Sequence, residues 1–223
     1  YQGQKCSAAS RAFIPRSIWP RVKKGLLKEI ARIRMGDPTD FSNFMCAVID
    51  RHAFDSIKKY IAHAKRSKDA TILAGGRCDS RNGWFIEPTL VQAKKPDFKL
   101  LREEIFGPVL TVYVYNDASL DRTLKLCDSG SPYALTGAVF AQDRTAIRKI
   151  ADALTNAAGN FYINDKPTGA VVGQQPFGGG RASGTNDKAG SHLNLIRWVS
   201  PRTIKETFVP PTSFGYPYMM PED

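Results

Sequence analysis

The chain has 223 residues, and its 32 lysines and arginines outnumber its 21 aspartates and glutamates, giving a formal net charge of +11. With 42% hydrophobic and 24% charged residues, the composition excludes collagen-like, low-complexity and disordered chains, and no apolar run approaches the roughly 18 residues of a membrane span. The basic residues are spread along the chain without zinc-finger spacing, an RNA-recognition signature or a basic stripe on one element, so a solvated surface is favoured over a nucleic-acid partner.

Two amphipathic helices are predicted in the first third of the chain. Apolar residues recur every three or four positions over residues 18–34 and again over residues 52–65. Pro20 suits the first turn of the first helix, and the Gly-Asp-Pro sequence at 36–38 ends it. The apolar stripe of the second helix comprises Phe54, Ile57, Ile61 and Ala64.

Short apolar strands and further helices alternate through the middle of the chain. The predicted strands are residues 71–74, 84–86, 89–91, 109–115, 135–141 and 160–164, and the predicted helices are residues 119–127 and 144–154. This alternation predicts an α/β domain with a largely parallel sheet flanked by helices.

Regular periodicity stops between residues 165 and 190, where glycines and small polar residues accumulate. A loop of this length inside a compact domain is usually functional. One more strand is predicted over residues 203–208, and the chain then becomes rich in proline and aromatic residues. Because such a tail cannot form a core alone, we expect it to pack against a partner subunit in a homo-oligomer.

The four cysteines are Cys6, Cys46, Cys78 and Cys127. Their spacing contains no C-x-x-C pair and does not suggest a metal site, so free thiols are expected. Cys6 is the candidate nucleophile, because a lysine precedes it and small residues follow it. A thiol buried in the core is an equally open interpretation of the local sequence.

A second candidate site surrounds Glu104 and Phe106. Two acidic residues stand before a Phe-Gly-Pro turn, which suits a carboxylate that binds sugar hydroxyls beside a ring that packs on a flat ligand. A solvated acidic pair before an ordinary turn is the alternative. The glycine-rich residues 173–180 match neither the P-loop nor the Gly-x-Gly-x-x-Gly pattern.

Three ordered motifs together resemble the aldehyde dehydrogenase superfamily. They are Gly-Gln-Lys-Cys at 3–6, Glu-Ile-Phe-Gly-Pro at 104–108 and Pro-Phe-Gly-Gly at 176–179. The resemblance covers essentially the whole chain. Residues 160–166, 173–177 and 183–188 look like one branch, whose members oxidise glutamate-γ-semialdehyde to glutamate in proline catabolism in the mitochondrial matrix.

The resemblance implies a catalytic domain over residues 1–199, with an active-site loop at 165–190, and a C-terminal strand and tail at 200–223. In the superfamily, the cysteine matching Cys6 attacks the aldehyde carbon to form a thiohemiacetal. Hydride then passes to NAD, and water hydrolyses the resulting thioester. The backbone N–H of Cys6 would be one donor of the oxyanion hole.

Further roles follow from the same resemblance. The glutamate matching Glu104 binds the nicotinamide-ribose hydroxyls, and the aromatic residue matching Phe106 packs near the nicotinamide. Binding of the semialdehyde substrate is implied for Ser7, Gly169, Ala170 and Phe177. Many members of the branch have serine in place of Ala170, which should matter little if backbone groups hold the substrate carboxylate.

Members of the superfamily also carry, upstream of this cysteine, an NAD-binding domain, a glutamate general base and an oxyanion-hole asparagine. Because the chain starts five residues before Cys6, we expect it to be part of a longer protein, with the missing N-terminal NAD-binding part as its partner, and to be inactive alone. The alternatives are a dehydrogenase of another semialdehyde and a non-catalytic oligomerisation fragment.

Overall fold

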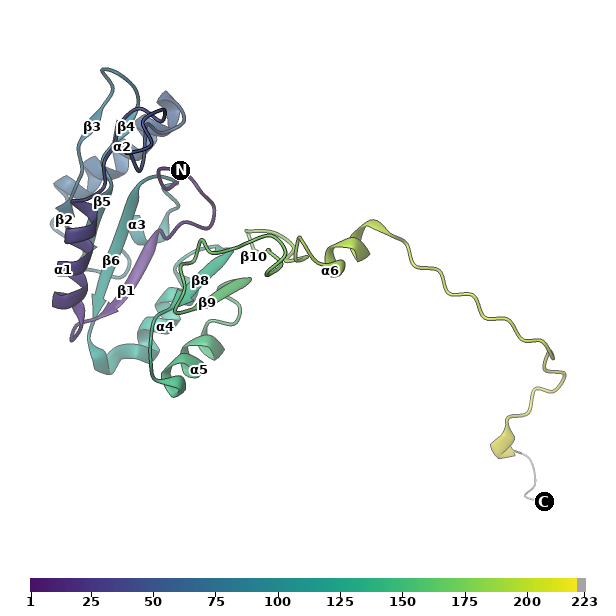
Figure 1. Ribbon diagram of the computed structural model, residues 1–223. Coiled ribbons are helices and arrows are strands. Elements are labelled where there is room, and N and C mark those ends of the chain that lie inside the picture. Colours follow the sequence, from purple (N-terminus) through teal and green to yellow (C-terminus); the bar gives the residue numbers. More distant parts are fainter. Residues whose placement is uncertain (220–223) are drawn as a thin grey trace.

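The computed structural model describes residues 1–219, in which short strands alternate with helices (Figure 1). The strands are β1 (Arg11–Pro15), β2 (Ala70–Ala74), β3 (Cys78–Asp79), β4 (Phe85–Ile86), β5 (Thr89–Ala93), β6 (Val109–Tyr115), β7 (Tyr133–Ala134), β8 (Thr136–Val139), β9 (Asn160–Ile163) and β10 (Gly180–Arg181). The helices are α1 (Trp19–Ile30), α2 (Arg51–Arg66), α3 (Lys99–Arg102), α4 (Leu120–Ser129), α5 (Arg144–Ala153) and α6 (His192–Leu195).

The main sheet has the strand order β1-β6-β5-β2. β1, β6 and β5 are parallel, and β2 adds an antiparallel edge. β8 and β9 form a separate parallel pair, and Figure 1 shows this pair beside β1. The prediction of a largely parallel α/β sheet is therefore confirmed, with the parallel strands divided between two sheets. β3 with β4 and β7 with β10 form two further, antiparallel pairs.

Helices cover both faces of the main sheet. Successive side chains of a strand point to opposite faces, and Val91 of β5 packs with the stripe of α2 while Leu90 packs with Trp19 of α1. The predicted stripe of α2 is confirmed, since each of its four residues is buried. The Asp50 carboxylate accepts a hydrogen bond from the Ala53 N–H at 2.7 Å and so caps the first turn of α2.

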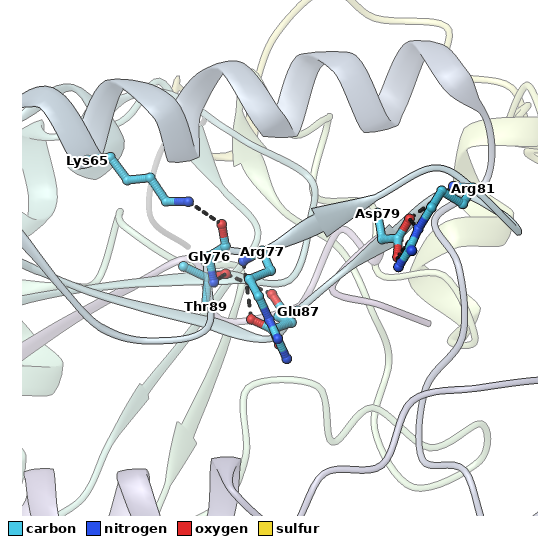
Figure 2. A network of polar contacts seen from close by, with 7 residues as sticks. All are labelled: Lys65, Gly76, Arg77, Asp79, Arg81, Glu87 and Thr89. Atoms are coloured by element: carbon cyan, nitrogen blue, oxygen red, sulfur yellow. Dashed lines mark hydrogen bonds and ion pairs between the residues drawn. The ribbon is translucent and has the colours of Figure 1, made fainter.

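A polar network fixes the turn after β2 between α2 and β5 (Figure 2). The Lys65 ammonium of α2 donates to the Gly76 carbonyl at 2.7 Å, and the Gly76 N–H donates to the Thr89 hydroxyl at 3.0 Å. The Arg77 guanidinium donates to the Glu87 carboxylate at 2.7 Å. These hydrogen bonds hold the turn to α2 through Lys65 and to β5 through Thr89.

The structure differs from the predicted elements near α1. The first helix ends at Ile30, four residues earlier than the predicted end at Arg34. The N–H groups of Arg32 and Ile33 bond to the carbonyls three residues back, and the Arg34 carbonyl accepts a hydrogen bond from the Phe44 N–H at 2.9 Å. β1 was not predicted from the sequence. Its residues, Arg-Ala-Phe-Ile-Pro, do not alternate between apolar and polar side chains, and all five are half-buried.

The predicted strand over residues 203–208 is wrong, because this segment has no regular secondary structure. Ile204 is 75% exposed and Phe208 is 89% exposed, and Figure 1 shows the tail extending away from the two sheets. A strand forms by pairing with another strand, and this segment has no such neighbour within residues 1–219. The part of the tail at 220–223 lies outside the described residues.

Within residues 1–219, no helix combines the length and apolar character that crossing a membrane requires.

Candidate active site

Segments that are far apart in the sequence meet at the amino-terminal ends of the parallel strands. The segment with Cys6 leads into β1, and residues 104–108 lead into the neighbouring parallel strand β6. At the start of β8, the Thr136 hydroxyl donates to the Ser7 carbonyl at 3.4 Å. The first residue of β9 binds residues 176–178. All three sequence motifs therefore border one region.

Gly3 brings the first two motifs into direct contact. It has a φ of +67°, and a Cβ atom at this position would lie 2.2 Å from the Gly107 carbonyl oxygen. Gly107 is itself pressed against α2, because a Cβ atom on it would lie 2.6 Å from Ile57 Cδ1. The cysteine segment is thus packed on the Phe-Gly-Pro turn, and the turn is packed on the core helix.

The Cys6 thiol is exposed, and the other three cysteines are half-buried. Burial raises the pKa of the Cys127 thiol, and burial likewise raises the pKa of Cys78 against the opposing effect of nearby Lys65. The thiolate is the reactive form, and a raised pKa leaves less of it at neutral pH. Cys78 and Cys127 are therefore less reactive than thiols of ordinary pKa. The exposure of Cys6 does not fit the alternative interpretation as a core thiol.

The structure distinguishes the two neighbouring glutamates. The Tyr60 hydroxyl of α2 donates to the Glu103 carboxylate at 2.8 Å, and this bond raises the pKa of Tyr60. Glu104 is exposed, and within residues 1–219 its carboxylate accepts a single hydrogen bond, from the Phe106 N–H at 3.3 Å. Phe106 has a φ of 55°, unusual for a residue other than glycine, and is 43% exposed. An exposed ring thus lies next to an available carboxylate, as a flat ligand with hydroxyl groups requires.

The loop that begins at residue 165 reaches back to the cysteine segment. The Lys5 ammonium donates to the Thr168 carbonyl at 3.5 Å. Gly169 is held from both sides, because its N–H donates to the Lys166 carbonyl and its carbonyl accepts from the Gln175 amide, each at 3.0 Å. Within residues 1–219, the N–H of Ala170 makes no hydrogen bond to the protein. The Ala170 N–H is therefore available to a ligand, whereas the Gly169 N–H is already bonded within the loop.

Phe177 is half-buried, and its backbone is paired with Ala189. The two residues exchange hydrogen bonds of 2.9 and 2.8 Å. Asn160 binds the residues on either side of Phe177. Sequence reasoning did not single out Asn160, Thr136 or Gln175 as site residues. Their signal in the sequence is weak, since a polar residue at the start of a strand or within a loop is common.

The chain matches the family described as "Aldehyde dehydrogenase family" over residues 1–204. It is 63% identical to the mitochondrial delta-1-pyrroline-5-carboxylate dehydrogenase of Dictyostelium discoideum over 220 residues, which is 99% of this chain and 39% of the relative. It is 55% identical to the enzyme of the same name from Homo sapiens, covering 98% of this chain and 39% of the relative.

Solved structures give a consistent result. The crystal structure of the delta-pyrroline-5-carboxylate dehydrogenase from Mycobacterium tuberculosis superposes with a TM-score of 0.84 at 52% identity, covering 100% of this chain and 41% of that one. The form of that enzyme bound with NAD gives a TM-score of 0.83 at 53% identity, covering 99% of this chain and 40% of that one. The chain thus spans about 40% of the length of the relatives it matches.

Proposed function

Because this chain belongs to the aldehyde dehydrogenase family, we propose that it supplies the nucleophile and part of the cofactor site of an NAD-dependent enzyme that oxidises glutamate-γ-semialdehyde to glutamate. The observation that carries this proposal is the exposed thiol of Cys6 beside the turn that bears Glu104 and Phe106. The relatives named after pyrroline-5-carboxylate, the cyclic form of the semialdehyde, support the substrate.

Cys6 is the proposed catalytic nucleophile. Its thiolate attacks the aldehyde carbon, and a C–S bond forms as the carbonyl oxygen takes negative charge. Within residues 1–219, the backbone N–H of Cys6 has no hydrogen-bond partner in the protein, so it is available to donate to this oxygen. A preorganised donor of this kind typically contributes about 3 kcal/mol to the transition state. Once the substrate carbon has lost its hydride, the adduct is a thioester, and water releases the acid product from Cys6.

Glu104 and Phe106 are the proposed cofactor contacts. The exposed Glu104 carboxylate suits the hydroxyls of a ribose, and the exposed Phe106 ring suits the face of a nicotinamide. NAD, when bound, supplies the acceptor for the hydride that leaves the substrate carbon. The Gly3 contact holds this turn against the segment that carries Cys6.

Substrate binding is assigned to Ser7, Gly169, Ala170 and Phe177. The free N–H of Ala170 supports a backbone contact to the substrate carboxylate, since it is available to an anion, and Gly169 shapes the same loop. Ser7 is only 3% exposed, and its hydroxyl makes no hydrogen bond within residues 1–219, which leaves it available as a second donor. Phe177 would line the aliphatic part of the substrate.

The proposed partner is the remainder of a longer protein. Among the described residues, β1 and β8 each pair on one edge, and a groove of about 820 Å³ lies between them. Residues of both strands line the groove together with residues of α4 and α5. Unpaired strand edges accept a further strand through main-chain hydrogen bonds. A strand inserted there would join the two sheets.

The relatives' names support a mitochondrial location, and the exposed tail supports a homo-oligomer.

NADH formation with pyrroline-5-carboxylate tests this function. The chain alone is compared with a chimera in which it replaces the matched segment of the Mycobacterium tuberculosis relative. We expect the chimera to form NADH in a Cys6-dependent manner and the chain alone to form none. Faster oxidation of an uncharged aldehyde of similar length would contradict the substrate, and an unchanged rate in the Cys6→Ala chimera would contradict the nucleophile.

A further inference from the structure

Asn160 holds the backbone on both sides of Phe177. Its side-chain amide nitrogen donates to the Pro176 carbonyl at 2.9 Å, and its amide oxygen accepts from the Gly178 N–H at 3.0 Å. Asn160 is 9% exposed, so these bonds form away from bulk water, where an unpaired polar group is costly. Together with the Ala189 pairing, this contact fixes the Phe177 segment from two directions.

The adjacent glycine shows how closely this segment lies against β9. A Cβ atom on Gly159 would come within 2.0 Å of the Gly178 carbonyl oxygen. The Lys188 ammonium also donates to the Gly159 carbonyl, from the segment that pairs with Phe177. The Phe177 segment therefore has little freedom to shift relative to the start of β9.

Thr136 makes the corresponding contact on the neighbouring strand. β8 and β9 are parallel, and Thr136 is the register partner of Asn160. Its hydroxyl donates to the carbonyl of Ser7, the residue that follows Cys6. One pair of adjacent strand residues thus contacts the nucleophile segment on one side and the Phe177 segment on the other.

We propose that Thr136 and Asn160 are positioning residues that set the separation between the Cys6 thiol and the Phe177 wall, and thereby select the length of the carboxylate-bearing substrate. This inference rests on the proposed function, because it takes Cys6 as the nucleophile and Phe177 as a substrate contact. The strand pair acts as a rigid spacer, since both residues are held by backbone pairing as well as by their side chains. Displacements near 1 Å at such sites are expected to cost large factors in rate.

The test measures alkylation of Cys6 in the 223-residue chain. The reagents are 5-iodopentanoate, which carries its carboxylate at the same carbon spacing as glutamate-γ-semialdehyde, and 5-iodopentanamide, which is neutral. In each reaction the Cys6 sulfur forms a C–S bond as the C–I bond breaks and iodide leaves. The ratio of the two rates reports how well the carboxylate contacts and the thiol are aligned.

The first variant is Asn160→Asp, which keeps the acceptor for the Gly178 N–H and replaces the donor to the Pro176 carbonyl with an oxygen. We expect the rate ratio to fall roughly tenfold, with the rate toward the small reagent iodoacetamide unchanged. Asn164→Asp is the matched control. Asn164 also bridges an N–H and a carbonyl, those of Ala141, at 2.9 Å each, but it lies at the opposite end of β9.

A second pair of variants addresses the other strand. Thr136→Val removes the hydroxyl and keeps the shape of the side chain, whereas Thr136→Ser keeps the hydroxyl. The ratio of the pentanoate rate to the pentanamide rate should fall in Thr136→Val and stay near the wild-type value in Thr136→Ser. The hydrogen-exchange rate of the Gly178 amide, measured by NMR, should rise in Asn160→Ala and stay low in Asn160→Asp.

The outcomes separate this inference from the proposed function. If the wild-type chain shows no preference for the pentanoate over the pentanamide, the proposed substrate fails, and the inference fails with it. If the wild-type chain shows the preference and Asn160→Asp and Thr136→Val retain it, only the inference is overturned. Equal losses in Asn160→Asp and Asn164→Asp would assign a general structural role to both residues and would also overturn it.

Discussion

At the scale of single residues, solvent exposure and hydrogen-bond partners distinguish side chains of the same type. Cys6 is exposed while the other cysteines are half-buried, and Glu104 is available while Glu103 is bound by Tyr60. Gly3 is required by the close approach of Gly107. These features follow from contacts between segments that are distant in the sequence.

The first prediction concerns the order in which the thiols react. We expect Cys6 to be alkylated first by iodoacetamide at neutral pH, because it is exposed and the pKa of Cys127 is raised by burial. A raised pKa leaves less thiolate at a given pH, so labelling of Cys127 should become comparable only at higher pH. Mass spectrometry of the partly labelled native chain measures this order, and earlier labelling of Cys127 would contradict it.

The second prediction compares two glycine substitutions. Gly3→Ala should destabilise the chain by more than about 1 kcal/mol, because the new Cβ meets the Gly107 carbonyl at a positive φ. Gly25→Ala in α1 is the matched control, since a Cβ there meets nothing within 4 Å. It should stabilise the chain by about 0.5–1 kcal/mol through its higher helix propensity. Urea unfolding measures both, and equal effects would contradict the contact.

At the scale of elements, the proposed site lies where the motif segments enter their strands. Ligands of open α/β sheets usually bind at the carboxyl ends of the strands. Here Cys6 precedes β1, Phe106 precedes β6 and Asn160 opens β9, so the groups gather at the amino ends. The reason is that these segments are packed on one another through Gly3, Thr136 and Asn160.

The third prediction concerns the polar network between α2 and β5 (Figure 2). The hydrogen bond from Arg77 lowers the pKa of Glu87 below its ordinary value of 4.5. A lowered folded-state pKa contributes stability above the ordinary value, and this contribution is lost as the pH falls through the folded-state value. Glu87→Gln should therefore lower the urea midpoint at pH 7, by a small amount because Arg77 is largely exposed.

The difference between Glu87→Gln and the wild type should shrink as the pH falls below 4.5, since the unfolded wild-type chain then binds the proton first, and it should vanish once the pH falls below the lowered folded-state pKa of Glu87. Glu29→Gln in α1 is the control, because its ion pair with Arg32 is exposed on both sides and should contribute little at pH 7. A difference for Glu87→Gln that grows toward low pH would reverse the predicted sign.

At the scale of the whole molecule, the most prominent feature is the division of the sheet. Within the part of the chain that the structure describes, β1 and β8 border the same groove with edges that have no strand partner. The segment after residue 198 extends away from both sheets (Figure 1). Large apolar side chains of this tail are solvent-exposed, among them Phe208 and Phe214. Exposed apolar side chains and free strand edges together indicate surfaces that bind other polypeptide segments.

The fourth prediction follows from these edges. In the chain alone, the β1 amides that do not bond to β6 should exchange with solvent rapidly, as should the β8 amides that do not bond to β9. In the Mycobacterium tuberculosis chimera, an inserted strand should protect them, while β5 should change little because it already has neighbours on both sides. Hydrogen exchange followed by mass spectrometry compares the two proteins. Protection of the β1 edge in the chain alone would contradict the open groove.

The sequence by itself determined the elements with strong local periodicity and the order of the motifs. The stripe of α2, the apolar run of β6 and the alternation of helices with strands are written in neighbouring residues, so each was predicted within a few positions. The Cys6, Glu104–Phe106 and Phe177 motifs, with the family they indicate, were identified in the same way.

Only the tertiary structure decided where α1 ends, that β1 exists, and that residues 203–208 form no strand. It also decided which glutamate is free and that Asn160 holds the Phe177 segment. The physical reason is the same in each case. A strand edge, a helix end or a buried amide is stabilised by a partner that lies far along the chain, and the pattern of neighbouring residues does not specify that partner.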